Sequence, residues 1–154
     1  MQLELSVNGQ QYSVDVAAER FLLDLLRRDL GIHDVLEACD EGECGSCTVL
    51  IDGEAVDSCI YLAAQCRDRE VTTVGGLSRG EQLSALQKAF VDAGAVQCGF
   101  CTPGLIVAAT ALLEEDPEPN EEAIREGLAG NLCRCTGYNN VVDAVARAAR
   151  GEPS

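Results

Sequence analysis

Hydrophobic and polar residues alternate along the first sixteen positions, as they do in a β-strand with one buried face. The apolar positions of this segment are Leu3, Leu5, Val7, Tyr12, Val14 and Val16. Asn8-Gly9 divides the alternation in two, and this dipeptide accepts the positive φ angles of a tight hairpin turn. The pattern therefore predicts a β-hairpin at the start of the chain.

The apolar spacing then changes to that of a helix and later returns to that of strands. Across 19–31, leucines at positions 22, 25, 26 and 30 follow helical spacing, and Gly31 is a suitable end for the helix. Two apolar runs surround the turn dipeptide Asp52-Gly53, and "EVTTV" at 70–74 is a further strand pattern. We expect the first half of the chain to be a sheet crossed by one helix.

Only helical patterns are visible after Gly75-Gly76. Helices are predicted within 78–94, over 102–116, from 120 onward and through 140–150. In the second of these, Thr102 is the expected N-cap and Pro103 the first helical residue. The change of pattern predicts an α+β protein with its helices in the second half.

The length of 154 residues, with 47% hydrophobic and 24% charged residues, suits one medium domain or two small ones. Where the pattern changes, near 74–78, we place a boundary between a β-rich domain, 1–76, and a helical domain, 77–154. Domains of this size have small hydrophobic cores, so a ligated metal centre in each would help to hold the fold.

The start of the chain and its net charge limit the cellular location and the kinds of partner that we expect. The first sixteen residues lack the basic and apolar regions of a secretion signal, and the longest apolar run, 105–113, is too short to span a bilayer. The net charge of -15 opposes binding to nucleic acid or to an anionic membrane. We expect a cytoplasmic protein with no nucleic-acid partner and no membrane span. In that reducing compartment, clustered cysteines bind metal more often than they form disulfides.

Eight of the nine cysteines fall into two groups. The first group consists of Cys39, Cys44, Cys47 and Cys59. Its C-x4-C-x2-C…C order is the spacing of plant-type [2Fe-2S] ferredoxins. Gly42 and Gly45 let the loop curl so that backbone N–H groups point at an anionic cluster, while Asp40, Glu41 and Glu43 are expected to face solvent. Zinc is the alternative for four thiolates, although zinc sites usually pair two short C-x2-C knuckles.

The second group consists of Cys98, Cys101, Cys133 and Cys135, in the order C-x2-C…C-x-C. Each half of the group directly precedes a predicted helix, so two helix N-termini would lie beside one anionic centre. This spacing alone is compatible with zinc as well as with an iron-sulfur cluster. A ferredoxin loop in the same chain favours a second [2Fe-2S] cluster.

Three further residues have simpler expected roles. Cys66 is the odd cysteine, and we expect it to be a small buried hydrophobe. His33 is the only histidine, which excludes Rieske-type ligation by two histidines. Tyr138 follows the last cysteines and is expected to pack there. The chain has no motif of a nucleotide or substrate site.

The motifs together resemble the small iron-sulfur subunit of the molybdenum hydroxylases, the xanthine dehydrogenase and aldehyde oxidase family. They read "CDEGECGSCTV" from 39, "SC" at 58–59, "QCGFCTPG" from 97 and "GNLCRCTGY" from 130. The resemblance covers nearly the whole chain and all eight grouped cysteines. It implies a plant-type ferredoxin-like domain of the β-grasp fold, then an all-α four-helix-bundle domain, with one [2Fe-2S] cluster in each.

The resemblance also implies an electron relay within a larger enzyme. In this family a large subunit holds a molybdopterin cofactor and oxidises a purine, another N-heterocycle or an aldehyde, and a medium subunit holds FAD. Electrons would pass from molybdopterin through the helical-domain cluster and then the ferredoxin-like cluster to FAD. Gln97 and Cys135 lie at the positions that approach the pterin, where Gln97 is either a hydrogen-bond donor or a plain surface residue. A dimer of heterotrimers is the assembly that the family suggests.

Two other functions are compatible with the cysteine spacing. A free-standing two-cluster ferredoxin would be a stable monomer without large exposed apolar surface, whereas a subunit would expose apolar residues for its partners. A zinc-stabilised structural adaptor would be colourless.

Overall fold

A β-hairpin begins the fold of the computed structural model, which describes residues 1–152; the last two residues of the predicted second domain, 153–154, lie outside the described residues. β1 (Gln2–Val7) and β2 (Gln10–Asp15) pair antiparallel, with Val7 opposite Gln10. Asn8 and Gly9 form the turn at φ angles of 53° and 79°. The predicted hairpin is therefore confirmed.

The strands form one mixed sheet. β3 (Thr48–Ile51) and β4 (Glu54–Asp57) make a second antiparallel hairpin around the predicted Asp52-Gly53 turn. β5 (Glu70–Thr72) runs parallel to β1 and antiparallel to β3, which gives the order β2-β1-β5-β3-β4. The last strand in the sequence thus lies in the middle of the sheet and joins the two hairpins.

The predicted first helix is present, but its second half is wider than an α-helix. α1 (Leu22–Asp24) continues as the π-helical turn η1 (Leu25–Asp29), in which the N–H of Leu30 donates to the carbonyl of Leu25. The leucines at 22, 23, 25 and 26 are buried in the core of this domain. The short 3-10 helices that flank β5 are η2 (Ala63–Cys66) and η3 (Val74–Leu77).

The second domain is helical, as predicted. Its helices are α2 (Ala85–Asp92), α3 (Thr102–Glu115), α4 (Glu121–Gly127) and α5 (Asn139–Ala149). They enclose a core in which Phe90, Leu105 and Ile124 are fully buried. The predicted start of α4 at residue 120 agrees with the structure, in which Asn120 is the N-cap and its Oδ1 accepts the N–H of Ala123 at 2.9 Å. Across residues 1–152, no helix is long and apolar enough to cross a membrane.

α2 lies inside its predicted range, whereas the cap of α3 differs from the predicted residue. α2 begins only after Ser84, whose hydroxyl accepts the N–H of Gln87 and so caps the helix. α3 is capped by Cys101 and not by Thr102, so that prediction was wrong by one residue. The carbonyl of Cys101 accepts the N–H of Leu105, whereas the buried hydroxyl of Thr102 has no hydrogen-bond partner among the described residues.

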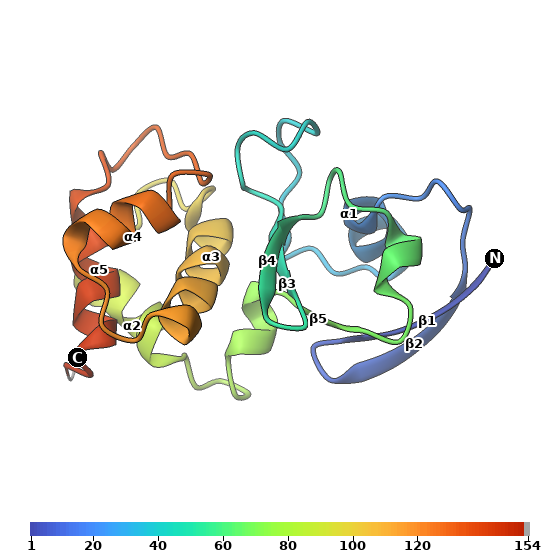
Figure 1. Ribbon diagram of the computed structural model, residues 1–154, viewed down its shortest axis with the longest axis horizontal. Helices are drawn as coiled ribbons and strands as arrows, with labels where there is room; N and C mark the ends of the chain where they lie inside the picture. Colours follow the sequence, from blue (N-terminus) through green and yellow to red (C-terminus); the bar gives the residue numbers. More distant parts are fainter. Residues whose placement is uncertain (153–154) are drawn as a thin grey trace.

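The two domains lie side by side, with α3 nearest the β3–β4 hairpin (Figure 1). The chain passes from β5 through η3 into the helical domain, and the predicted boundary after residue 76 falls within η3. The loop at 38–47 and the loop before α5 project from the same side of the molecule, at the top of the view. Both loops carry grouped cysteines, so the two groups lie near the contact between the domains.

Candidate metal centres

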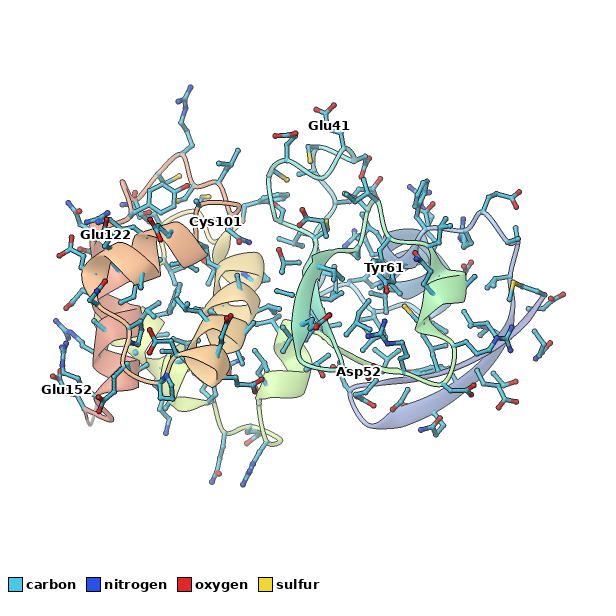
Figure 2. The ribbon with its side chains drawn as sticks, in the orientation of Figure 1. Glu41, Asp52, Tyr61, Cys101, Glu122 and Glu152 are labelled. Atoms are coloured by element: carbon cyan, nitrogen blue, oxygen red, sulfur yellow. The ribbon has the colours of Figure 1, made fainter. Side chains whose placement is uncertain are left out.

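The first cysteine group is built on the loop before β3 and on the segment that follows β4. Gly42 and Gly45 adopt φ angles of 75° and 72° in the loop, a conformation that favours glycine. The acidic side chains between the cysteines are exposed, as predicted. Figure 2 shows one of them, Glu41, at the outer tip of the loop. The loop therefore turns its backbone inward and its carboxylates outward.

Backbone N–H groups of this loop converge on Cys39. Hydrogen bonds from the backbone of Glu41, Cys44 and Glu43 lower the pKa of the Cys39 thiol to about 7, and the Cys44 thiol adds a weaker contribution. Amides that favour a thiolate over a thiol also favour an anionic cluster bound through that sulfur. The Cys39 sulfur thus lies in the kind of anion-binding concavity that an iron-sulfur cluster requires.

Cys47 and Cys59 form the buried side of the same group. Burial raises the pKa of both thiols, that of Cys59 to about 12, and the two side chains lie beside each other. A metal ligand must be a thiolate, and a bound cation offsets the cost of a buried negative charge. Cys47 and Cys59 are therefore suited to bind a metal cation, whereas without a cation their burial favours the neutral thiol over the thiolate.

The second group combines the segment before α3 with the segment before α5. The Cys101 side chain lies beside that of Cys133, and the Cys98 side chain lies beside that of Cys135. Burial raises the pKa of the Cys101 thiol to about 12. Burial also raises the pKa of the Cys133 thiol. The hydroxyl and backbone N–H of Thr136, 3.1 and 3.4 Å from its sulfur, together with weaker contributions from Cys101 and the backbone of Cys135, outweigh that effect and bring the pKa to about 7.

The cysteines of each group come together as two pairs. These pairs are Cys39 with Cys44, Cys47 with Cys59, Cys98 with Cys135 and Cys101 with Cys133. Within residues 1–152, no three Cys, His, Asp or Glu side chains are placed to hold a single metal ion. A structural zinc ion needs four ligands around one point, whereas a [2Fe-2S] cluster takes two ligands on each of two irons. The paired arrangement therefore fits a two-iron cluster in each group.

The residues predicted to approach a pterin lie at the surface. Gln97 and Cys135 are both exposed, and so is Cys98. Exposed apolar side chains accompany them, with Phe100 at 47% and Leu132 at 55% exposure. The second group thus has a solvent-facing side, while Cys101 lies on its buried side, at the end of the helical domain from which the loops project (Figure 2).

Tyr138 does more than pack. It adopts a left-handed backbone conformation at a φ of 70° before α5. Its hydroxyl accepts the N–H of Cys133 at 2.7 Å and donates to the carbonyl of Asn131 at 2.9 Å. The side chain therefore closes the loop that carries Cys133. The hydrogen bond joins a backbone N–H and a tyrosine five positions apart, and no pattern in the sequence predicted it.

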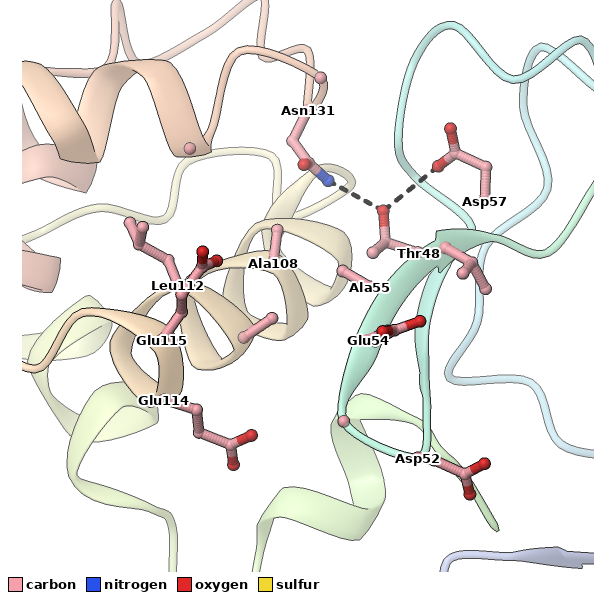
Figure 3. Close-up of a pocket in the computed structure, with 15 residues that line it drawn as sticks. Thr48, Asp52, Glu54, Ala55, Asp57, Ala108, Leu112, Glu114, Glu115 and Asn131 are labelled. Carbon is pink, nitrogen blue, oxygen red and sulfur yellow. Dashed lines mark hydrogen bonds between the residues drawn. The ribbon is translucent and has the colours of Figure 1, made fainter. Parts of the chain in front are cut away.

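The contact between the domains joins the two cysteine loops directly, and the sequence did not predict it. The N–H of Leu132 donates to the carbonyl of Cys44 at 2.9 Å, and the Asn131 amide donates to the carbonyl of Gly45 at 3.0 Å. Below this contact, a groove of about 790 Å³ separates the β3–β4 hairpin from α3 (Figure 3). Carboxylates of both domains line it, among them Glu54 and Glu115.

The buried ninth cysteine lies apart from both groups. Cys66 is fully buried in the core of the first domain, as predicted, and burial raises the pKa of its thiol to about 11. His33 is exposed on the surface. Neither residue belongs to a cysteine group.

Comparison with known proteins agrees with this geometry. A family model described as "2Fe-2S iron-sulfur cluster binding domain" matches residues 5–78, and one described as "[2Fe-2S] binding domain" matches residues 73–146. The nicotinate dehydrogenase small FeS subunit of Eubacterium barkeri is 46% identical over 93% of this chain and 91% of its own length. The xanthine dehydrogenase iron-sulfur-binding subunit of Escherichia coli O157:H7 is 48% identical, also over 93% of this chain and 91% of its own.

A solved structure extends the likeness to the whole fold. A chain in the crystal structure of quinoline 2-oxidoreductase from Pseudomonas putida 86 is 43% identical and superposes with a TM-score of 0.91, over 100% of this chain and 98% of that one. The predicted ferredoxin-like and helical fold, with two [2Fe-2S]-binding domains, is therefore confirmed. The chain belongs to the family of small iron-sulfur subunits of the molybdenum hydroxylases, and its role is electron transfer within such an oxidoreductase.

Proposed function

We propose that the eight grouped cysteines hold the two clusters and that the chain connects a molybdopterin centre on a large subunit with FAD on a medium subunit. The ligands of the first cluster would be Cys39, Cys44, Cys47 and Cys59. The ligands of the second would be Cys98, Cys101, Cys133 and Cys135. The observation that carries the proposal is that each group of four cysteines, lying as two neighbouring pairs, falls within one of the two matched [2Fe-2S] binding domains.

A [2Fe-2S] cluster accepts and releases one electron at a time, which suits a chain that joins two cofactors of other subunits. The protein's own part is to stabilise anionic sulfur and to exclude water. The amides around Cys39 and the hydroxyl and N–H of Thr136 at Cys133 serve the first purpose. The burial of Cys47 and Cys101 serves the second.

We assign one exposed face to each partner. The large molybdopterin subunit would cover the apolar surface around Cys98 and Cys135, where Gln97 is free to donate a hydrogen bond to the pterin. The medium FAD subunit would cover the other face, where Phe21 and Ile60 are 43% and 55% exposed and Phe21 lines a small hollow with Cys59. Large apolar side chains at the surface commonly mark a protein interface.

The finer features of the assembly are also proposals. We propose a dimer of heterotrimers in the cytoplasm, a boundary between the domains after residue 76, and a purine, another N-heterocycle or an aldehyde as the substrate of the complex. The names of the similar chains, which include nicotinate, xanthine and nicotine enzymes, support an N-heterocycle. They also favour a subunit over a free-standing ferredoxin, because these relatives are named as subunits.

The test is purification of the native complex, with metal, sulfide and flavin analysis and EPR of the reduced state. We expect two irons and two sulfides for each cluster and two distinct signals, with molybdenum and FAD in the associated chains. Cys47→Ser should remove one EPR signal and Cys135→Ser the other, while Cys66→Ser should keep both. Zinc in place of iron, or two clusters in a chain without partners, would contradict the proposal.

A further inference from the structure

Asn131 connects the two domains from a buried position. It lies in the loop between α4 and Cys133, and only 6% of the residue is exposed. Its side-chain amide donates to the carbonyl of Gly45 at 3.0 Å. It also donates to the hydroxyl of Thr48 at 3.1 Å, a bond that Figure 3 shows. Both acceptors belong to the first domain. A side-chain amide has two N–H donors, and here both donate to acceptors of the first domain.

The acceptors are themselves held in place. The Thr48 hydroxyl donates to the Gly45 carbonyl at 2.6 Å, and its oxygen also lies 3.4 Å from a carboxylate oxygen of Asp57. Asn131, Gly45 and Thr48 therefore form a closed triangle of hydrogen bonds. Gly45 follows the proposed ligand Cys44, and Thr48 follows the proposed ligand Cys47.

The backbone of Asn131 is fixed to the second cysteine loop. Its carbonyl accepts the Tyr138 hydroxyl, which in turn accepts the N–H of Cys133. The next residue, Leu132, donates its N–H to the carbonyl of Cys44. One short segment is thus linked through Tyr138 to a proposed ligand of the second cluster and is bonded directly to the loop of the first.

The contact between Gly45 and residues 130–131 is tightly packed. A Cβ atom on Gly45 would lie 2.5 Å from the carbonyl oxygen of Gly130 and 2.6 Å from the Asn131 amide nitrogen, closer than such atoms approach in folded proteins. Small residues at a contact let two backbones approach closely. A displacement of the Asn131 side chain would therefore move the two loops relative to each other.

We propose that Asn131 is a positioning residue whose side chain fixes the separation and orientation of the two cysteine loops, and with them the coupling between the clusters. This proposal rests on the ligand sets proposed above. Magnetic coupling between two reduced clusters falls with the cube of their separation and depends on their relative orientation. A change in the separation or in its spread is therefore visible in the EPR spectrum of the fully reduced protein.

The test is the native complex with Asn131→Ala, compared with Asn140→Ala. Asn140 is the matched control because its amide also donates to a glycine carbonyl, that of Gly94 at 3.1 Å, but within the helical domain. We expect Asn131→Ala to keep the iron content and both cluster signals, to lose the resolved spin–spin splitting, and to slow turnover. Asn140→Ala should keep the splitting of the wild type.

The outcomes separate the two proposals. If the wild type gives two signals and Asn131→Ala retains the full splitting, the role of Asn131 is wrong and the ligand sets stand. A wild type without two cluster signals overturns the ligand sets and the role of Asn131 with them. If Asn131→Ala fails to assemble, Thr48→Val decides, because it keeps the shape of the side chain and removes one acceptor of the Asn131 amide. A partial loss of splitting supports the proposal, and unchanged splitting overturns it.

Discussion

Gly104 offers the sharpest test of the contact between the domains. It lies buried in the first turn of α3, facing the loop that holds Cys44. A Cβ atom at this position would overlap the carbonyl oxygen of Gly45 and would lie 3.1 Å from the amide nitrogen of Asn131. The Gly45 oxygen belongs to the backbone, and the Asn131 amide is held by two hydrogen bonds, so Gly104→Ala can be accommodated only if a backbone segment moves.

Gly127→Ala is the matched control, because it also adds a methyl group to a crowded helical glycine. Its Cβ atom would lie 2.9 and 3.0 Å from the methyl groups of Leu112, a side chain that can rotate away. Alanine favours a helix over glycine by up to about 1 kcal/mol, and this gain is similar in both variants. Overpacking against a rigid neighbour costs about 1–3 kcal/mol. We therefore expect Gly104→Ala to be less stable than Gly127→Ala by about 2 kcal/mol.

The assay is thermal melting of the two iron-loaded variants at equal iron content. For a chain of this size, the expected difference in stability corresponds to a melting temperature roughly 4–8 °C lower for Gly104→Ala than for Gly127→Ala. Hydrogen exchange at the amide of Leu132, which bonds to Cys44, should accelerate in Gly104→Ala alone. Equal melting temperatures together with unchanged exchange at Leu132 would refute the rigid contact.

Two further predictions concern single side chains. Tyr138→Phe removes the hydroxyl that bonds to the N–H of Cys133 and to the carbonyl of Asn131. The free energy of unfolding should therefore fall by about 1–3 kcal/mol, measured as a lower melting temperature. An unchanged melting temperature would show that water replaces the hydroxyl. A hydrogen bond from the Arg69 side chain and one from the backbone of Glu70 hold the pKa of Asp52 below its usual range. A carboxylate whose pKa is lower in the folded state than in the unfolded state stabilises the protein at pH values above the unfolded-state pKa, about 3.9 for Asp. This stabilisation is lost as the pH falls through the folded-state pKa. Asp52→Asn should therefore melt below the wild type at pH 7, and the difference should disappear in acid; a difference that persists there would contradict the role of the charge.

Local patterns predicted most of the elements correctly, because each depends on neighbours in the sequence. Asn8-Gly9 and Asp52-Gly53 form the predicted tight turns, with positive φ angles at all four residues. The helical period before Gly31 identified a helix, although it did not reveal the π-helical turn. At α3, Thr102 has the residue type of a cap but lies one position inside the helix. Cap positions depend on where the preceding loop directs the chain, and here that loop carries Cys98 and Cys101.

The cysteine groups were predictable for a different reason. Their spacing is imposed by the chemistry of the ligand, which is the same in every protein that binds it. In the structure these eight side chains lie as four neighbouring pairs, and their role as ligands stays a prediction. The pairs could not be read from the sequence, because C-x4-C-x2-C states which residues share a loop but not which sulfurs meet.

The contact between the domains was invisible in the sequence for a physical reason. Its bonds join positions 83 to 88 residues apart, Leu132 to Cys44 and Asn131 to Gly45 and Thr48, and no local preference records such a pairing. Taken singly, these residues have no feature in the sequence that marks them as part of a contact between domains. A chain that only held two clusters would not need a close contact between its domains, since each domain has its own core. An electron-transfer subunit needs both clusters at a fixed separation, and hydrogen bonds between the two ligand loops maintain that separation more directly than contacts elsewhere in the domains.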